Sequence, residues 1–225
     1  MTTRVHTIAV LGGTGAEGSG LALRWARAGH RVTLGSRNPE KAAQVCRELN
    51  ALVGRNSIAF ADYHSAAAAA AIVVLTVPHR AQQATVNEVR EDIAGKILID
   101  ATVPLVPPKV ARVQLPAGGS AVAEVQRMLG DTVRVVSAFQ NVSAQQLRDL
   151  NHSIDCDVLV CGDDVSAREI VVALARDIGL RAYHAGPICN SAAAEALTSI
   201  LISLNIRYQV PGAGIRITGI PDAAS

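Results

Sequence analysis

A glycine-rich turn lies near the start of the chain, between an apolar run and a helical pattern. Residues 8–11 read Ile-Ala-Val-Leu, and the next residues fit the pattern G-x-G-x-x-G with Gly13, Gly15 and Gly18. In a strand–turn–helix unit, such glycines let the backbone approach a diphosphate and let the helix pack on the strand. The helix N-terminus then offers N–H groups to the anion. The context favours a dinucleotide-binding unit over a glycine-rich turn without a ligand.

A polar and basic segment follows the second predicted strand. Sites for NAD usually carry an Asp or Glu there, which binds the ribose 2′-hydroxyl. This chain has Ser36 and Arg37 instead, with Lys41 on the first turn of a helix that Asn38 caps. A hydroxyl, a guanidinium and an ammonium attract a 2′-phosphate, which a carboxylate would repel. The segment therefore favours NADP(H) over NAD(H), the alternative being solvated surface charge.

Short apolar runs alternate with helical segments along the rest of the chain. Further strands are expected at residues 31–35, 57–61, 72–77, 96–101, 132–137, 157–161 and 181–183. Helix starts are indicated by Asn38, Asp62, Ser120, Asp163-Asp164 and a capping box from Ser143 to Gln146. The alternation predicts an α/β fold of the Rossmann type, with a doubly wound, mainly parallel sheet.

The chain is expected to divide into a larger and a smaller part. We assign residues 1–138 to an NADP-binding Rossmann domain. Residues 139–225 form a smaller C-terminal α/β segment that completes the acceptor site and a dimer interface. This segment ends in a helix that is apolar on nearly all sides, with Leu197, Ile200, Leu201, Leu204 and Tyr208 on one stripe and Ile202 and Ile206 on another. Because such a helix must be covered on more than one side, we expect a homodimer in which it crosses the partner.

Composition argues against several other classes of protein. Aromatic residues are 3% and the net charge is +2, so nucleic acid has little to bind. The longest apolar run, residues 66–77, is too short to span a bilayer, and the first strand starts almost at once, so no N-terminal signal is visible. We expect a cytoplasmic protein that binds small molecules and neither nucleic acid nor membranes.

The cysteines and histidines show no metal-ligand spacing. Cys46, Cys156, Cys161 and Cys189 lie in or beside apolar runs without a C-x-x-C pattern. This favours buried free thiols in a reducing compartment over a metal or disulfide set. We expect no metal site.

The predicted nicotinamide position has few acid–base groups. The ring is expected near residues 76–78 and 101–104, at the ends of two strands. All lysines precede residue 110. This disfavours the active site of the β-hydroxyacid dehydrogenases, which relies on a lysine from the C-terminal part of the chain. His79 is the best-placed titratable side chain, with a structural or solvent contact as the alternative role. Hydride transfer between two stacked conjugated rings needs little acid–base help, since the protein mainly holds the rings about 3–3.5 Å apart and excludes water.

Several short motifs over nearly the whole chain carry a family resemblance. They are Leu11-Gly-Gly-Thr-Gly15, Gly20-Leu-Ala-Leu23, Gly35-Ser-Arg37, Leu75-Thr-Val-Pro78, Cys161-Gly-Asp-Asp164, Ala185-Gly-Pro187 and Gly212-Ala-Gly-Ile215. With them the chain resembles the NADPH-dependent reductases of the deazaflavin coenzyme F-420. The resemblance implies reversible hydride exchange between NADP(H) and C5 of the deazaflavin, in a dimer without a metal.

The resemblance also implies roles for particular positions. Thr14, Ser36, Arg37 and Lys41 would hold NADP, Pro78 would border the nicotinamide, and residues 139–142 would lie near the deazaflavin. This chain differs from some family members at two places. Those members have Pro-Trp-Glu where this chain has Pro78-His79-Arg80, and they have His where this chain has Gln140. Arg80, Lys109 or Arg112 could serve the phosphate and polyglutamate tail of F-420.

Two sets of site residues follow. Binding of NADP(H) is assigned to Gly12, Gly13, Thr14, Gly15, Ala16, Glu17, Gly18, Ser36, Arg37, Lys41, Thr76, Val77, Pro78 and Ala101. Positioning of the two rings is assigned to Pro78, Val103, Pro104, Phe139, Gln140 and Val142, with no catalytic side chain. An NADPH-dependent reductase of a flavin or other small acceptor, and a non-catalytic NADP(H)-binding regulatory module, are the alternative functions.

Overall fold

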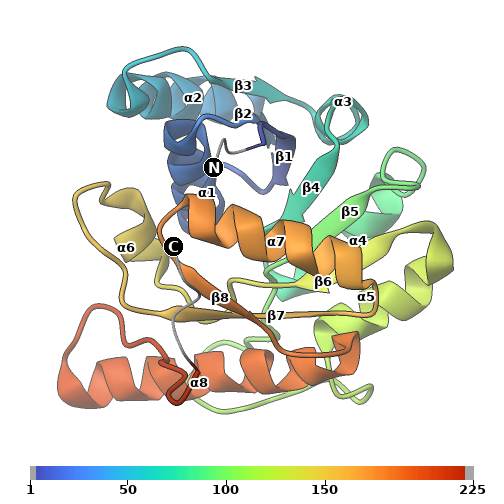
Figure 1. Cartoon of the computed structure of the whole chain (residues 1–225). Helices are drawn as coiled ribbons and strands as arrows, with labels where there is room; N and C mark the ends of the chain where they lie inside the picture. The colour runs from blue at the N-terminus through green and yellow to red at the C-terminus, as the bar shows by residue number, and fades with distance from the viewer. Residues whose placement is uncertain (1–3, 221–225) are drawn as a thin grey trace.

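Eight strands form one sheet in the order β3-β2-β1-β4-β5-β6-β7-β8, in a computed structural model that describes residues 4–220 (Figure 1). The strands are β1 (Thr7–Leu11), β2 (Arg31–Gly35), β3 (Ile58–Ala61), β4 (Ile72–Leu75), β5 (Ile97–Asp100), β6 (Arg134–Ser137), β7 (Asp157–Gly162) and β8 (Arg181–His184). All neighbouring pairs are parallel except β6 and β7. The mainly parallel, doubly wound sheet is confirmed.

Helices cover both faces of this sheet. They are α1 (Ala16–Ala28), α2 (Pro39–Val53), α3 (Tyr63–Ala69), α4 (His79–Glu88), α5 (Ala121–Leu129), α6 (Ala144–Arg148), α7 (Val165–Asp177) and α8 (Ser191–Tyr208). One apolar core joins the sheet to α1, α2 and α7, and a second joins it to α3, α4 and α5. Strand β4 is buried along its whole length, as a central parallel strand covered on both faces should be.

Helix starts follow local side-chain chemistry in most cases. Asn38, Asp62, Ser120 and Asp164 each accept a hydrogen bond from the backbone N–H three residues on. The predicted capping box at Ser143 is wrong, because Ser143 makes no side-chain cap bond and the helix is only five residues long. Ser143 instead lies against the C-terminal segment, where its hydroxyl donates to the carbonyl oxygen of Pro211.

The antiparallel pairing of β6 with β7 decides where the connecting segment lies. Residues 138–156 leave β6 and enter β7 at the same edge of the sheet, because the strands run in opposite directions. That edge is the carboxyl edge of β1, β4 and β5, where ligands of such sheets bind. Residues 139–142, which the family resemblance places near the deazaflavin, thus lie at the same edge of the sheet as the glycine-rich turn.

The C-terminal part completes the sheet and ends in α8, which Figure 1 shows along the lower side of the molecule. Ser191, Ala194 and Glu195 of α8 are buried, whereas its second half is mostly exposed. The division of the chain at residue 138 remains our prediction. Residues 1–3 and 221–225, at the outer ends of the two predicted parts, lie outside the described part of the chain. Within residues 4–220, no helix is long and apolar enough to cross a membrane.

The cysteines are free thiols. Cys46, Cys156 and Cys161 are buried, as predicted. Cys189 is exposed, which corrects the prediction, because it lies in the surface 3-10 turn η2 (Ile188–Asn190).

Candidate functional site

The glycine-rich turn joins the end of β1 to the start of α1. Gly12 has φ +82°, a left-handed conformation that favours glycine. The N–H of Gly15 donates to the carbonyl oxygen of Gly12, 2.9 Å away. Gly15 is also the N-cap of α1, and it provides no side-chain cap. The N-terminus of α1 is therefore left with uncapped N–H groups, as an anion site requires.

Gly18 lets α1 pack against the end of β4. A Cβ at this position would lie 2.5 Å from Thr76 Oγ1 and 2.9 Å from the carbonyl oxygen of Gly12. The Thr76 hydroxyl is itself fixed, since it donates to the carbonyl oxygen of Leu11 at 3.0 Å. The predicted packing role of Gly18 is confirmed.

The basic segment lies at the carboxyl end of β2. Ser36 is buried, and its hydroxyl accepts from the N–H of Asn38 and donates to the carbonyl oxygen of the same residue. Arg37 and Lys41 are exposed, and the Arg37 guanidinium lies 5.6 Å from the centre of the Tyr63 ring. Ser36 thus shapes the turn, while the two cations are open to a ligand.

A cavity of about 430 Å³ opens at the carboxyl edge of the sheet, beside the glycine-rich turn. Its lining is formed by Gly15, Ala16, Glu17, Thr76, Val77, Pro78, His79, Ala101, Thr102, Val103, Leu105, Gln140, Val142, Ala144 and Thr198. These residues come from the start of α1, the ends of β4 and β5, the segment after β6, and α8. The structure therefore brings together most of the residues assigned to the nicotinamide and to the second ring.

Several assigned residues lie outside this lining. Gly12, Gly13, Thr14 and Gly18 belong to the turn itself, and Ser36, Arg37 and Lys41 lie at β2. Pro104 is buried, and Phe139 is a core residue whose ring meets Trp25 edge-on at 5.6 Å. Arg80, Lys109 and Arg112 are exposed and do not line the cavity.

Leu105, Ala144 and Thr198 line the cavity but are not predicted from the sequence, whereas Thr102 lies within the segment 101–104 that is expected near the nicotinamide. Thr102 and Leu105 belong to the proline-rich segment after β5, so the beginning of that segment forms part of the cavity wall. Thr198 reaches the site only because α8 packs there, and its hydroxyl donates to the carbonyl oxygen of Gln140 at 2.8 Å. No local sequence signal indicates this contact.

Asp100, at the end of β5, organises the polar groups behind the cavity. It is fully buried, and its carboxylate accepts from Gln82 Nε2 at 2.7 Å and from the N–H of Thr102 at 2.9 Å. Its carbonyl oxygen accepts from Gln140 Nε2 at 2.7 Å. Burial raises the pKa of Asp100, and the hydrogen bonds from Thr102 and Gln82 oppose that change.

Two of these polar groups keep acceptor capacity toward the cavity. Gln140 Oε1 and Thr102 Oγ1 are buried and have no hydrogen-bond partner among residues 4–220. Buried polar atoms are usually paired. Because both residues line the cavity, a ligand with N–H or O–H groups can supply the missing donors.

The segment after β6 is held in an unusual backbone conformation. Phe139 has φ +77°, which is uncommon for a residue with a side chain. Burial of its ring and the bond from Asn141 Nδ2 to the carbonyl oxygen of Ala194, 2.8 Å long, hold the segment in place. This conformation directs Gln140 toward Asp100.

Glu17, the second residue of α1, is half-buried in the cavity wall. Burial raises its pKa, the negative charge of Asp100 adds to the effect, and the result is a pKa of about 8. At neutral pH its carboxyl group is therefore mostly protonated.

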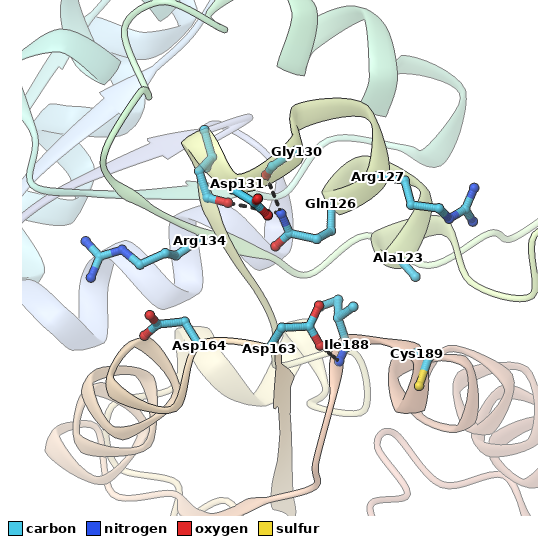
Figure 2. Close-up of a pocket in the computed structure, with 11 residues that line it drawn as sticks. Ala123, Gln126, Arg127, Gly130, Asp131, Arg134, Asp163, Asp164, Ile188 and Cys189 are labelled. Atoms are coloured by element: carbon cyan, nitrogen blue, oxygen red, sulfur yellow. Dashed lines mark hydrogen bonds between the residues drawn. The ribbon is translucent and has the colours of Figure 1, made fainter.

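A larger cavity, of about 640 Å³, lies between α5, the start of β6 and the end of β7 (Figure 2). Since β6 and β7 are antiparallel, this cavity lies at the opposite edge of the sheet from the glycine-rich turn. Figure 2 shows Arg127 and Arg134 pointing away from each other, so they do not converge on one anion. Asp163 accepts from the N–H of Ile188, and Asp164 caps α7. We therefore place the candidate site at the smaller cavity.

Comparison with known proteins shows which family the chain resembles. Residues 7–104 match the family model described as NADP oxidoreductase, coenzyme F-420-dependent. The chain is 42% identical to an F-420-dependent NADP reductase of Methanothermobacter thermautotrophicus, over 97% of each chain. It is 39% identical to an F-420-dependent NADP reductase of Methanocaldococcus jannaschii, over 95% of this chain and 98% of the relative.

The fold is similar to that of a solved structure. A protein from Arthrobacter sp. FB24, provisionally named an F-420-dependent NADP reductase, superposes with a TM-score of 0.80 at 27% identity. The match covers 94% of this chain and 99% of that one.

Proposed function

Since the chain belongs to the family of coenzyme F-420-dependent NADP oxidoreductases, we propose that it transfers a hydride between NADP(H) and the deazaflavin of coenzyme F-420. The observation that carries the proposal is a single cavity between the glycine-rich turn, the ends of β4 and β5, and residues 140–144. Such a cavity can hold two rings against each other, which is the main requirement of this reaction.

The NADP(H) side fits a phosphorylated dinucleotide. The uncapped N-terminus of α1 would bind the diphosphate. Arg37 and Lys41 are exposed at the end of β2, and Arg37 lies over Tyr63, so they would bind the 2′-phosphate. The other turn residues, Gly12, Gly13 and Thr14, would line the path between the diphosphate and the 2′-phosphate.

The acceptor side is lined by backbone and short side chains. Pro78, Val103 and Val142 give apolar surface for stacked rings. Gln140 Oε1 and Thr102 Oγ1 give unpaired acceptors for the polar ring edges. Phe139 and Pro104 would support these residues from behind.

The active form would be a homodimer in the cytoplasm. The second half of α8 exposes Ile206 and Tyr208, which are 67% and 69% accessible. Exposed apolar surface of this extent on one helix is typical of an interface. We assign it to a second copy of the chain, because α8 also contributes Thr198 to the cavity.

The proposal is tested by offering NADPH with coenzyme F-420, FMN, FAD or no acceptor. Oxidation of NADPH with F-420 and not with flavins supports the proposal. Turnover with flavins alone indicates a flavin reductase, and tight NADPH binding without turnover indicates a regulatory module. Either of the last two results would overturn the proposed function.

A further inference from the structure

The motif Gly212-Ala-Gly-Ile215 belongs to the family resemblance but does not line the cavity. It lies in residues 211–217, which form a C-terminal strap. Gln209, the C-cap of α8, has φ +55° and turns the chain out of the helix. The strap that follows contacts α8, the segment after β6 and the start of β7.

One part of the strap joins α8 to the segment after β6. Gln146 Nε2 donates to the carbonyl oxygen of Gly212 at 3.2 Å, and the Ser143 hydroxyl donates to the carbonyl oxygen of Pro211 at 3.5 Å. From the side of α8, Asn205 Oδ1 accepts from the N–H of Ala213 at 2.7 Å. The strap is therefore bonded on one side to the helix that carries Thr198 and on the other to residues 143–146.

The other part of the strap is anchored to β7 through Asp157. The N–H of Asp157 donates to the carbonyl oxygen of Ile215 at 2.8 Å, and its carboxylate accepts from the N–H of Ile217 at 2.6 Å. Asp157 is fully buried, and Arg181 donates to both of its carboxylate oxygens at 2.9 Å. Because a bidentate ion pair fixes this carboxylate, the strap has a rigid support.

The two glycines of the motif lie where there is no room for a side chain. A Cβ at Gly212 would lie 2.8 Å from Ser143 Cβ, Ser143 Oγ and Gln146 Nε2. A Cβ at Gly214 would lie 2.7 Å from Cys156 Cβ and 2.9 Å from Cys156 Sγ. Neither glycine has a positive φ, so the space around them, and not the backbone conformation, excludes larger residues.

Both close contacts lead to the cavity wall. Ser143 lies between Val142 and Ala144 in the chain, and both of these neighbours line the cavity. Cys156 Sγ donates to the carbonyl oxygen of Asn141 at 3.3 Å. A displacement of the strap would therefore be transmitted to residues 141–144, which form the acceptor side of the proposed site.

We propose that the C-terminal strap positions the acceptor wall of the cavity, an inference that rests on the proposed function. Gly212 is the positioning residue, and it acts through Ser143 without touching a ligand. A methyl group at Gly212 has to displace Ser143, and Val142 and Ala144 move with it. The deazaflavin then loses the surface against which it is held, while the turn that binds NADP(H), on the other side of the cavity, keeps its structure.

The first test measures Gly212→Ala with each co-substrate. We expect kcat/KM for F-420 to fall about 10-fold or more, with the Kd for NADPH changed by less than about twofold, since small displacements of a reacting group are costly. The control is Gly162→Ala at the opposite edge of the sheet, where a Cβ would lie 3.0 Å from the carbonyl oxygen of Val135. It should lower the stability and leave both parameters unchanged.

A compensating substitution distinguishes positioning from general destabilisation. Ser143→Gly removes the Cβ and the hydroxyl that the new methyl group meets, and α6 loses little because Ser143 makes no cap bond. The remaining contact, Gln146 Nε2, is the end of a flexible side chain. The double variant Ser143→Gly/Gly212→Ala should therefore recover most of the kcat/KM for F-420. A double variant as poor as Gly212→Ala would overturn the proposal.

Hydrogen exchange of residues 141–147 tests the strap without any ligand. Exchange should be faster in Gly212→Ala than in the wild type and slow again in the double variant. If Gly212→Ala does not fold, Asn205→Ala, which only removes the bond to Ala213, should show the same pattern in milder form.

The outcomes separate this inference from the proposed function. Unchanged exchange of residues 141–147, or equal losses for F-420 and NADPH, would overturn the role of the strap. If the wild type binds NADPH but reduces no F-420, the proposed function fails. The exchange of residues 141–147 then decides alone whether the strap holds this segment.

Discussion

Arg24 of α1 donates from Nε to the carbonyl oxygen of Leu147, 2.9 Å away, and so joins the dinucleotide-binding helix to the segment after β6. Its Nη2 donates to three further carbonyl oxygens, those of Gln146, Asp149 and His152. Gly20 faces the same segment, since a Cβ there would lie 2.6 Å from Leu147 Cβ. The two halves of the proposed site are therefore held together by one guanidinium and one close helix contact.

Arg24→Ala should loosen the segment without affecting the basic end of the NADP(H) site. We expect a loss of about 2–3 kcal/mol in the free energy of unfolding, because charged hydrogen bonds to several carbonyl groups are lost. The KM for F-420 should rise more than the KM for NADPH. The control is Arg27→Ala, which removes an exposed arginine one turn along the same helix. Equal effects of the two variants on stability would contradict this role of Arg24.

Arg37→Glu should convert an attraction for the 2′-phosphate into a repulsion. We expect the Kd for NADPH to rise about 100-fold or more, which corresponds to about 2.7 kcal/mol. The Kd for NADH should change by less than about threefold, because NADH has no 2′-phosphate. Arg31→Glu, at the exposed opposite end of β2, is the matched control. Equal weakening of NADPH and NADH would show that Arg37 does not recognise the phosphate.

Gly18→Ala and Gly15→Ala should have different consequences. A Cβ at Gly18 meets Thr76 Oγ1 and a backbone oxygen at short distance, so we expect a loss of about 1–3 kcal/mol in stability. A Cβ at Gly15 meets only the carbonyl oxygen of Gly12, at 3.2 Å, so the fold should tolerate it. Gly15→Ala should still weaken NADPH binding, because the methyl group lies where the diphosphate approaches. Thermal unfolding and NADPH titration of both variants test this, and a stable Gly18→Ala protein would refute the packing argument.

Ile206→Asp should separate the proposed homodimer. The substitution places a charge in the exposed apolar part of α8, which would become an unpaired buried charge in the interface. Sedimentation should show a dimer for the wild type and a monomer for the variant. Val165→Asp changes an exposed valine on α7 and should leave the dimer intact. A monomeric wild type in dilute solution would contradict the assignment.

The stability of the apo protein should depend on pH through Glu17. The folded state holds the Glu17 proton up to a pH of about 8, whereas the pKa of a glutamate in an unfolded chain is 4.5. Between these values the folded state binds more protons, so this residue makes the wild type less stable as the pH rises. Glutamine does not titrate. The Tm of Glu17→Gln relative to wild type should therefore increase from pH 5 to pH 8 and then level off, and a constant difference would disprove the raised pKa.

Features that depend on residues close to one another in the chain could be predicted from the sequence. The glycine-rich turn and the caps Asn38, Asp62 and Ser120 are local, since each rests on a bond within a few residues. The strand pattern predicts the sheet because buried parallel strands are short apolar runs. It does not show that β7 reverses direction, because a buried strand has the same composition in either orientation.

The polar centre of the site could not be predicted in the same way. Asp100 is bonded by Gln82, Thr102 and Gln140, and only Thr102 is close to it in sequence. Thr198 depends on how α8 packs. The sequence indicates Glu17 as a coenzyme contact, but its pKa is raised first by burial and then by the charge of Asp100, and only the fold produces either effect.

The most direct test of the proposed function uses NADPH that carries deuterium at C4. The pro-R and the pro-S labelled forms are each incubated with the protein and oxidised F-420. If the hydride passes directly between the two rings, one of the two forms should place deuterium at C5 of the reduced deazaflavin. Mass spectrometry of the product measures this. Reduced F-420 without deuterium from both labelled forms, or no reduction of F-420 at all, would contradict the account.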